Sequence, residues 1–82
     1  MMLSAEITLY PLQEDYRPII KAFIDQLAGE NSVKKETFPT STVLTGDYDE
    51  VMAVFSRLMK WSYEKYGKMV FVVKFLPGYE AL

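Results

Sequence analysis

The sequence predicts an α+β fold in which two helices cover one face of a four-stranded antiparallel sheet. Two stretches repeat their apolar residues at helical spacing, and four stretches have the alternation or the β-branched composition of strands. Proline, glycine or a capping residue stands between most of these stretches. Their order is βαββαβ, which is that of the ferredoxin-like sandwich, so the first and third strands are expected at the centre of the sheet.

The first predicted strand runs from Leu3 to Leu12. Its apolar residues alternate with residues that are polar or amphipathic, and a period of two indicates a strand with one face on a core. Pro11 cannot donate a ladder hydrogen bond and is expected to end the strand. The apolar set is Leu3, Ala5, Ile7 and Leu9, and the other set is Ser4, Glu6, Thr8 and Tyr10.

The first predicted helix begins near Asp15, whose side chain can cap it, and has Pro18 in its first turn. Gly29 is expected to end the helix in the left-handed conformation. Its apolar residues recur at the spacing of one helix face; they are Tyr16, Ile19, Ile20, Phe23, Ile24 and Leu27.

Two shorter strands are expected next. Val33–Phe38 alternates and is charged, as suits an edge strand, and Pro39 breaks it. Thr40–Thr45 is uncharged and rich in β-branched residues, which favours a more interior strand.

The second helix is expected to follow a capping pattern of Asp47 and Glu50 and to end at Gly67. The last strand, Met69–Leu76, has apolar residues on both faces, interrupted by Lys74. A strand with this composition is usually buried on both faces. Because both helices lie on the same side, we expect the bare face or edge of the sheet to pack on a second copy of the chain; a monomer with a partly exposed apolar face is the alternative.

Length and composition restrict the function. The 82 residues suffice for one domain, 1–82, and the net charge of −2 gives no basic surface for nucleic acid. The sequence contains no cysteine and no histidine, so a Cys or His metal site, a catalytic thiol and an imidazole base are excluded, and no cofactor is indicated. A membrane span needs about 20 apolar residues, and no stretch approaches that length. With no basic leader pattern either, a cytoplasmic protein is expected.

Glu6 is the most informative carboxylate, because it lies in the middle of a predicted central strand. A carboxylate there must be paired, hydrated or bound to a ligand. Pairing with Lys74 is one explanation. The other is a small polar pocket in which Glu6 joins hydroxyl groups and a tyrosine, which would suit a cationic or amino-bearing heterocycle. The candidates that share the pocket are Ser4, Thr8, Tyr10, Ser41 or Thr42, and Thr45.

Two segments resemble a known family. Ile7–Leu12, followed by Asp15 and Tyr16, resembles the S-L-Y-P opening of the YkoF-type thiamine/hydroxymethylpyrimidine-binding domains. Thr40–Met52 resembles that family's S-T-x-x-x-G-x-x-D-x-V-M signature. The resemblance implies a non-enzymatic, cytoplasmic binder of thiamine or its pyrimidine moiety, associated with thiamine uptake or salvage. It also implies a single-domain member that assembles as a dimer or tetramer.

The resemblance also suggests ligand-binding residues. Ser41 and Thr42 match the family's Ser-Thr pair, and Tyr10 matches its tyrosine, for which packing next to Pro11 is the alternative role. Gly46 and Asp49 also match and are expected to form the turn and the start of the second helix. Thr8 replaces a frequent serine and Glu6 a frequent glutamine, so a hydroxyl is kept but an amide becomes an acid. The alternative function is an oligomeric structural or regulatory module with no small-molecule ligand. A carboxylate enzyme is disfavoured, because Asp47, Asp49 and Glu50 cluster at a helix start, where they act as caps.

Overall fold

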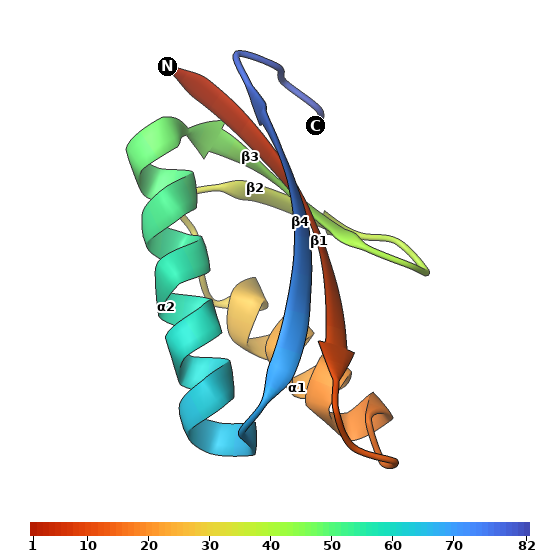
Figure 1. The fold of residues 1–82 in the computed structure, drawn as a ribbon. Helices are drawn as coiled ribbons and strands as arrows, with labels where there is room; N and C mark the ends of the chain where they lie inside the picture. Colours follow the sequence, from red (N-terminus) through yellow and green to blue (C-terminus); the bar gives the residue numbers. More distant parts are fainter.

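The computed structural model of the protein describes residues 1–82 and has the predicted element order (Figure 1). The elements are β1 (Met2–Pro11), α1 (Arg17–Ala28), β2 (Lys34–Thr37), β3 (Thr42–Asp47), α2 (Tyr48–Tyr66) and β4 (Met69–Pro77). All strand pairs are antiparallel and the sheet order is β2-β3-β1-β4. Both helices lie on the same side of the sheet. The ferredoxin-like α+β fold and the central positions of the first and third strands are therefore confirmed.

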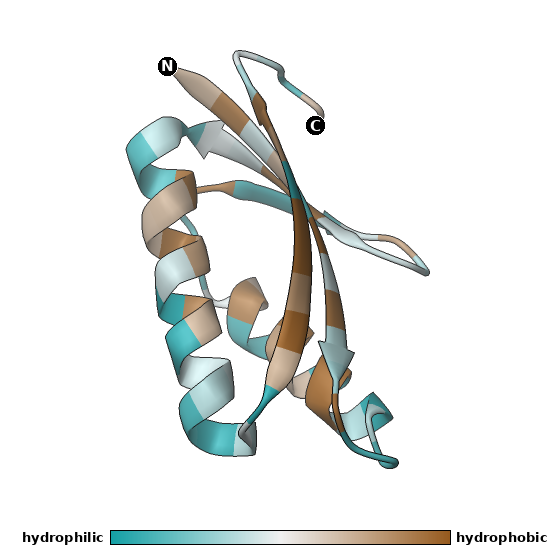
Figure 2. Cartoon of the chain, viewed as in Figure 1, coloured by the Kyte–Doolittle hydropathy of each residue, from teal (hydrophilic) through white to brown (hydrophobic).

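The core lies between β1 and the two helices. The predicted apolar face of β1 is buried as expected, and Ala5 is completely enclosed. Figure 2 shows the same alternation of hydrophobic and hydrophilic residues along β1, whereas β4 is hydrophobic along most of its length. Neither helix combines the length and apolar composition needed to cross a membrane.

An aromatic cluster joins β4 to both helices. The Phe71 ring lies 5.8 Å from the ring of Phe23 on α1 and 5.8 Å from that of Phe55 on α2. Phe55 also meets Phe75 edge to face at 5.9 Å. Edge-to-face contacts of this kind stabilise beyond the burial of their area. The helix-facing side of β4 is therefore packed within the single chain.

The helix ends differ in part from the prediction. The Asp47 carboxylate accepts a hydrogen bond from the Asp49 backbone N–H at 3.3 Å and caps α2, as expected. Asp15 does not cap α1: the N-cap is Tyr16, with no side-chain hydrogen bond. Gly29 does not adopt the left-handed conformation, since its φ is −79°, whereas Gly67 has a φ of +83°. The end of α1 therefore does not require glycine for its backbone angles.

The third strand begins and ends two residues later than predicted, and Gly46 lies inside it rather than in a turn. Gly46 pairs with Leu3 in the sheet. A Cβ atom at Gly46 would lie 3.2 Å from a Val33 methyl carbon. The glycine therefore allows the chain before β2 to approach β3 closely.

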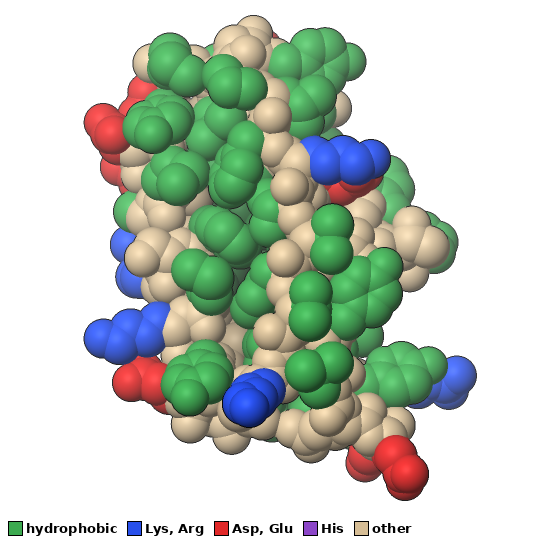
Figure 3. Space-filling model, in the orientation of Figure 1, with side chains coloured by type: hydrophobic (Ala, Val, Ile, Leu, Met, Phe, Trp, Pro, Cys, Tyr) green, Lys and Arg blue, Asp and Glu red, His purple; other side chains and the backbone are tan.

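We call the side of the sheet without helices the open face. Successive residues of a strand point to opposite faces, and paired residues of neighbouring strands share a face, so the register shows which residues of the four strands lie on it. Tyr10 and Val72 on this face are about half exposed, so the predicted second buried side of β4 is not covered within one chain. Space-filling representation shows hydrophobic side chains along the edge formed by β4 (Figure 3). The open face comprises Ser4, Glu6, Thr8 and Tyr10 of β1, Lys34 and Glu36 of β2, Val43 and Thr45 of β3, and Val70, Val72, Lys74 and Leu76 of β4.

Candidate binding site

A cleft lies between the second half of β1, the start of α1 and the loop that joins β2 to β3. It consists of two adjoining hollows, of about 440 Å³ and about 120 Å³. The larger volume falls within the range of roughly 300–1,000 Å³ that is usual for small-molecule sites. Both hollows are lined by Thr8, Leu9, Ile20, Pro39 and Thr40.

The larger hollow has aromatic and apolar walls. Tyr10 and Tyr16 line it together with Pro11 and Pro39. Both tyrosines are about half exposed, so their rings are free to meet a ligand. Tyr16 was predicted to belong to the core-facing side of the first helix. It instead lies at the N-cap, where the chain leaves the core.

The cleft is held together by one hydrogen bond between β1 and the loop. The Thr8 hydroxyl donates to the Thr40 carbonyl oxygen at 3.1 Å. The Phe38 backbone N–H donates to the Ser41 carbonyl at 2.7 Å and closes the loop into a tight turn. These two bonds place the loop over the end of β1.

Glu6 lies beside the cleft on the open face. One of its carboxylate oxygens is 3.5 Å from Lys74 Nζ, and the other accepts a hydrogen bond from the Ser41 hydroxyl at 3.4 Å. The predicted pairing with Lys74 is thus confirmed. The Glu6 side chain is still 40% exposed, and both contacts are long. The carboxylate therefore retains capacity to accept hydrogen bonds from a ligand.

The Ser-Thr pair is divided between the two sides of the sheet. Ser41 lies next to Glu6, whereas Thr42 pairs with Ile7 and faces the helices with 5% exposure. The Thr42 hydroxyl is 3.3 Å from the hydroxyl of Thr37. Of the two residues that could share the face of Glu6, the structure therefore selects Ser41.

The five predicted site residues nevertheless lie around one cleft. Thr8, Ser41 and Thr42 line the smaller hollow, and Thr8 and Tyr10 line the larger one. Glu6 adjoins them through Ser41. The loop residues Phe38–Thr40 also line the cleft and were not predicted from the sequence. Pro39, which breaks the edge strand, was the only sequence feature that indicated a loop there. The contribution of Ile20 was not predicted either, because this residue resembles any core residue of an amphipathic helix.

The other two polar residues proposed for this face, Ser4 and Thr45, lie away from the cleft. They are buried at the opposite end of the open face and bond to each other at 2.9 Å. They are therefore not available to a molecule in the cleft.

The cleft offers hydrogen bonding and aromatic contact rather than charge. Neither hollow is lined by a Lys, Arg, Asp or Glu residue. No three Asp or Glu side chains gather into a group that could hold a metal ion. A molecule in this cleft would meet tyrosine rings, prolines and threonine hydroxyls, with the Glu6 carboxylate at one side.

The fold and the cleft describe a small α+β protein with room for a compact, partly polar molecule. The model of the YKOF-related family matches residues 2–75, and the chain belongs to this family. A search of curated proteins finds no match.

Solved structures share the fold. A Streptococcus pneumoniae protein is 24% identical, with a TM-score of 0.78 over 96% of this chain and 89% of its own. A Thermotoga maritima protein provisionally assigned to thiamine biosynthesis or salvage is 21% identical, with a TM-score of 0.78 over 92% of this chain and 82% of its own. A hypothetical protein of Methanocaldococcus jannascii is 24% identical, with a TM-score of 0.79 over 95% of this chain and 81% of its own.

Proposed function

We propose that the protein is a non-enzymatic binder of thiamine or its hydroxymethylpyrimidine moiety, acting in the cytoplasm in thiamine uptake or salvage. The observation that carries this proposal is the cleft at the end of β1, with two tyrosines and several hydroxyls in a volume of about 440 Å³. Membership of the YKOF-related family and the fold shared with the Thermotoga maritima protein support the choice of ligand.

The chemistry of the pyrimidine fits the groups around the cleft. An aromatic ring can stack on Tyr10 or Tyr16, and its amino group can donate to the Ser41 hydroxyl or to the Glu6 carboxylate. Thr8 supplies a further hydroxyl at the boundary of the two hollows. The thiazolium ring of thiamine carries a fixed positive charge, which the Glu6 carboxylate and a tyrosine face both favour.

Calorimetric titration with thiamine and, separately, with hydroxymethylpyrimidine tests the proposal. We expect saturable heat for at least one of the two ligands, together with a higher melting temperature in its presence, because a ligand that binds only the folded state stabilises it. The absence of both effects at millimolar ligand would contradict the proposal.

A double variant locates the site. Ser41→Ala with Thr42→Val removes two hydroxyls and keeps the size of the side chains nearly constant, so the fold should persist while affinity falls. The loss of one hydrogen bond costs about 0.5–1.5 kcal/mol, which predicts a decrease of roughly twofold to twelvefold for each contact. Ser56→Ala, an exposed position on α2, is the matched control and should leave the affinity unchanged.

We further propose that the chain acts as a homo-oligomer through its open face. Exposed apolar residues, among them Val70 and Val72, occupy one end of this face, and the Glu6–Lys74 pair lies in its middle. Under a two-fold axis each copy would present the same positive and negative groups to the other, and such a surface can be self-complementary.

The open face also favours a second candidate function, an oligomeric interaction module with no small-molecule ligand. In that case the Ser41→Ala, Thr42→Val variant would assemble normally and neither ligand would give heat. The calorimetric experiment therefore separates the two candidates.

A further inference from the structure

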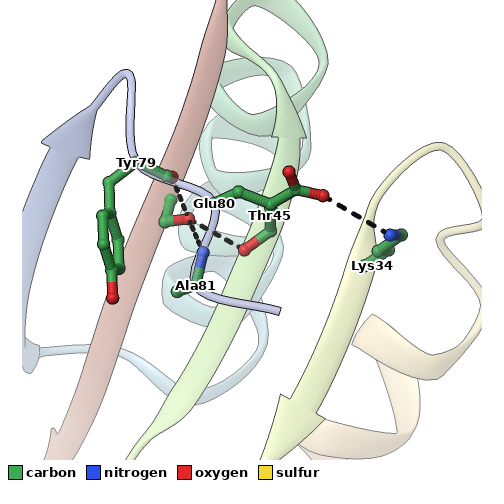
Figure 4. Close-up of polar contacts among 6 residues, drawn as sticks. Lys34, Thr45, Tyr79, Glu80 and Ala81 are labelled. Atoms are coloured by element: carbon green, nitrogen blue, oxygen red, sulfur yellow. Dashed lines mark hydrogen bonds and ion pairs between the residues drawn. The ribbon is translucent and has the colours of Figure 1, made fainter.

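The C-terminal residues Tyr79–Leu82 fold back over the open face. They follow β4, turn at Gly78, and lie on the side of the sheet away from the helices (Figures 1 and 4). We call this segment the strap. It passes over the end of the face that contains Ser4 and Thr45, which are only 0% and 1% exposed although no helix covers them.

The Ser4 hydroxyl is the anchor of the strap. Its oxygen is 2.6 Å from the Tyr79 carbonyl, 2.9 Å from the Ala81 backbone nitrogen and 2.9 Å from the Thr45 hydroxyl. A carbonyl only accepts, so the single Ser4 proton goes to Tyr79, and the Ala81 N–H and the Thr45 hydroxyl both donate to Ser4. All the hydrogen-bonding capacity of Ser4 is thus used (Figure 4).

The rest of the strap is loosely attached. Glu80 reaches Lys34 of β2 at 3.8 Å, and both side chains are more than half exposed. A hollow of about 260 Å³ lies between Glu80 and the start of β2. The Tyr79 side chain is 58% exposed. Of its four residues only Leu82 is half-buried, so the strap is held by its hydrogen bonds to Ser4, by one exposed ion pair and by this leucine.

The strap and a partner would occupy the same surface. The end of the open face that contains Val70 and Val72 is bare, whereas the Ser4 end is covered by the strap, and Leu76 beside it remains 38% exposed. A second copy that packed flat on the whole face would have to displace Tyr79–Leu82. With the strap in place, the same copy would reach only the bare end.

We propose that the strap competes with a second copy of the chain for the Ser4 end of the open face, and so limits self-association. This inference rests on the assembly part of the proposed function and not on ligand binding. Release of the strap exposes Ser4, Thr45 and Leu76 to the second copy.

Sedimentation velocity over a concentration series tests the competition. A chain that ends at Gly78 lacks the strap, and we expect its self-association to be at least tenfold tighter than that of the full chain. Ala81→Pro removes one N–H that donates to Ser4 and should shift association in the same direction by a smaller factor. Ala81→Gly keeps that N–H and should behave like the natural chain. Circular dichroism verifies that each variant is folded.

A nuclear magnetic resonance titration gives an independent measure. As the full chain associates, the Ala81 amide signal should move toward its value in an unstructured peptide. Unchanged or weaker association of both strap variants would overturn the proposal, as would an Ala81 signal that stays constant while the chain assembles. If the full chain and both variants remain monomeric, both the proposed assembly and the proposed competition by the strap are wrong. The proposed binding of thiamine is tested separately by calorimetry.

Discussion

Glu6 is the single residue whose charge should distinguish the two proposed ligands. Replacing it by glutamine keeps the shape and removes the charge, so attraction for the thiazolium cation is lost while hydroxymethylpyrimidine is affected less. A partly exposed ion pair contributes about 1 kcal/mol or less, which predicts at most a roughly fivefold weaker binding of thiamine. Calorimetry with both ligands measures the difference. An equal loss for the neutral and the cationic ligand would show that the charge of Glu6 is not the cause.

The matched control for this substitution is Glu64→Gln. Glu64 lies on α2 and is exposed, and it lines neither hollow of the cleft. It changes the net charge by the same amount, so any effect specific to Glu6 must arise from its position.

Residue patterns predicted which side of β1 is buried but not which member of the Ser-Thr pair faces Glu6. In β1 four apolar residues recur at every second position, so only one of its two faces can be the buried one. In Thr40–Thr45 the two apolar residues, Val43 and Leu44, are adjacent and the other residues all have hydroxyl groups, so alternation does not decide whether Ser41 or Thr42 shares the face of Glu6. Only the pairing of Thr42 with Ile7 decides the matter.

Among the elements, β4 depends on Phe71 for its attachment to both helices. We expect Phe71→Ala to destabilise the fold by about 2–3 kcal/mol, somewhat below the 3–5 kcal/mol of a fully buried phenylalanine, because Phe71 is only partly buried. Urea unfolding measures the change. Val72→Ala, on the opposite side of the same strand, is the control and should cost much less. Equal costs would contradict the packing described for the two faces.

An ion pair between Glu30 and Arg57 links the segment that follows α1 to α2. Two hydrogen bonds join them, at 2.7 Å and 3.2 Å. The hydrogen bond from Arg57 is the main cause that lowers the pKa of Glu30 from its usual 4.5. A lowered pKa in the folded state means that the pair stabilises the protein above the unfolded pKa and loses this effect as pH falls through the folded pKa.

The corresponding variant is Glu30→Gln. It should melt at a lower temperature than the natural chain at pH 7, and this difference should vanish as the pH is lowered well below 4.5. Glu64→Gln, at an exposed site, should show no such convergence. Thermal melts at several pH values measure both. A difference that persists at low pH would show that Glu30 acts through packing and not through its charge.

Sequence signals predicted the existence and order of every element but not all of their ends. Asp47 caps α2 because a short polar side chain precedes a free helix start. The same signal was misleading at Asp15, because the N-cap of α1 is the next residue, Tyr16, which makes no side-chain capping hydrogen bond. Gly46 resembled a turn residue, and only the close approach of Val33 explains a glycine inside a strand.

At the scale of the whole molecule, the surplus of apolar residues was predictable and the strap was not. The composition of β4 indicated that two helices could not cover all of its side chains. Tyr79–Leu82 has no periodicity and no turn motif beyond Gly78. Its position depends on the Ser4 hydroxyl, which lies 75 residues away from Tyr79 along the chain. Local patterns carry no information on such a contact.

The open face gives the last prediction, which concerns assembly. Val72 is 49% exposed at the bare end of this face, so an aspartate there is tolerated by the single chain. In a homo-oligomer the same aspartate would be desolvated against an apolar surface, and the cost of burying an unpaired charge should dissociate the copies. We expect Val72→Asp to sediment as a folded monomer at concentrations where the natural chain assembles. Ser56→Asp adds the same charge on α2 and should leave assembly intact. If Val72→Asp assembles as well as the natural chain, the contact between copies does not involve this end of the open face.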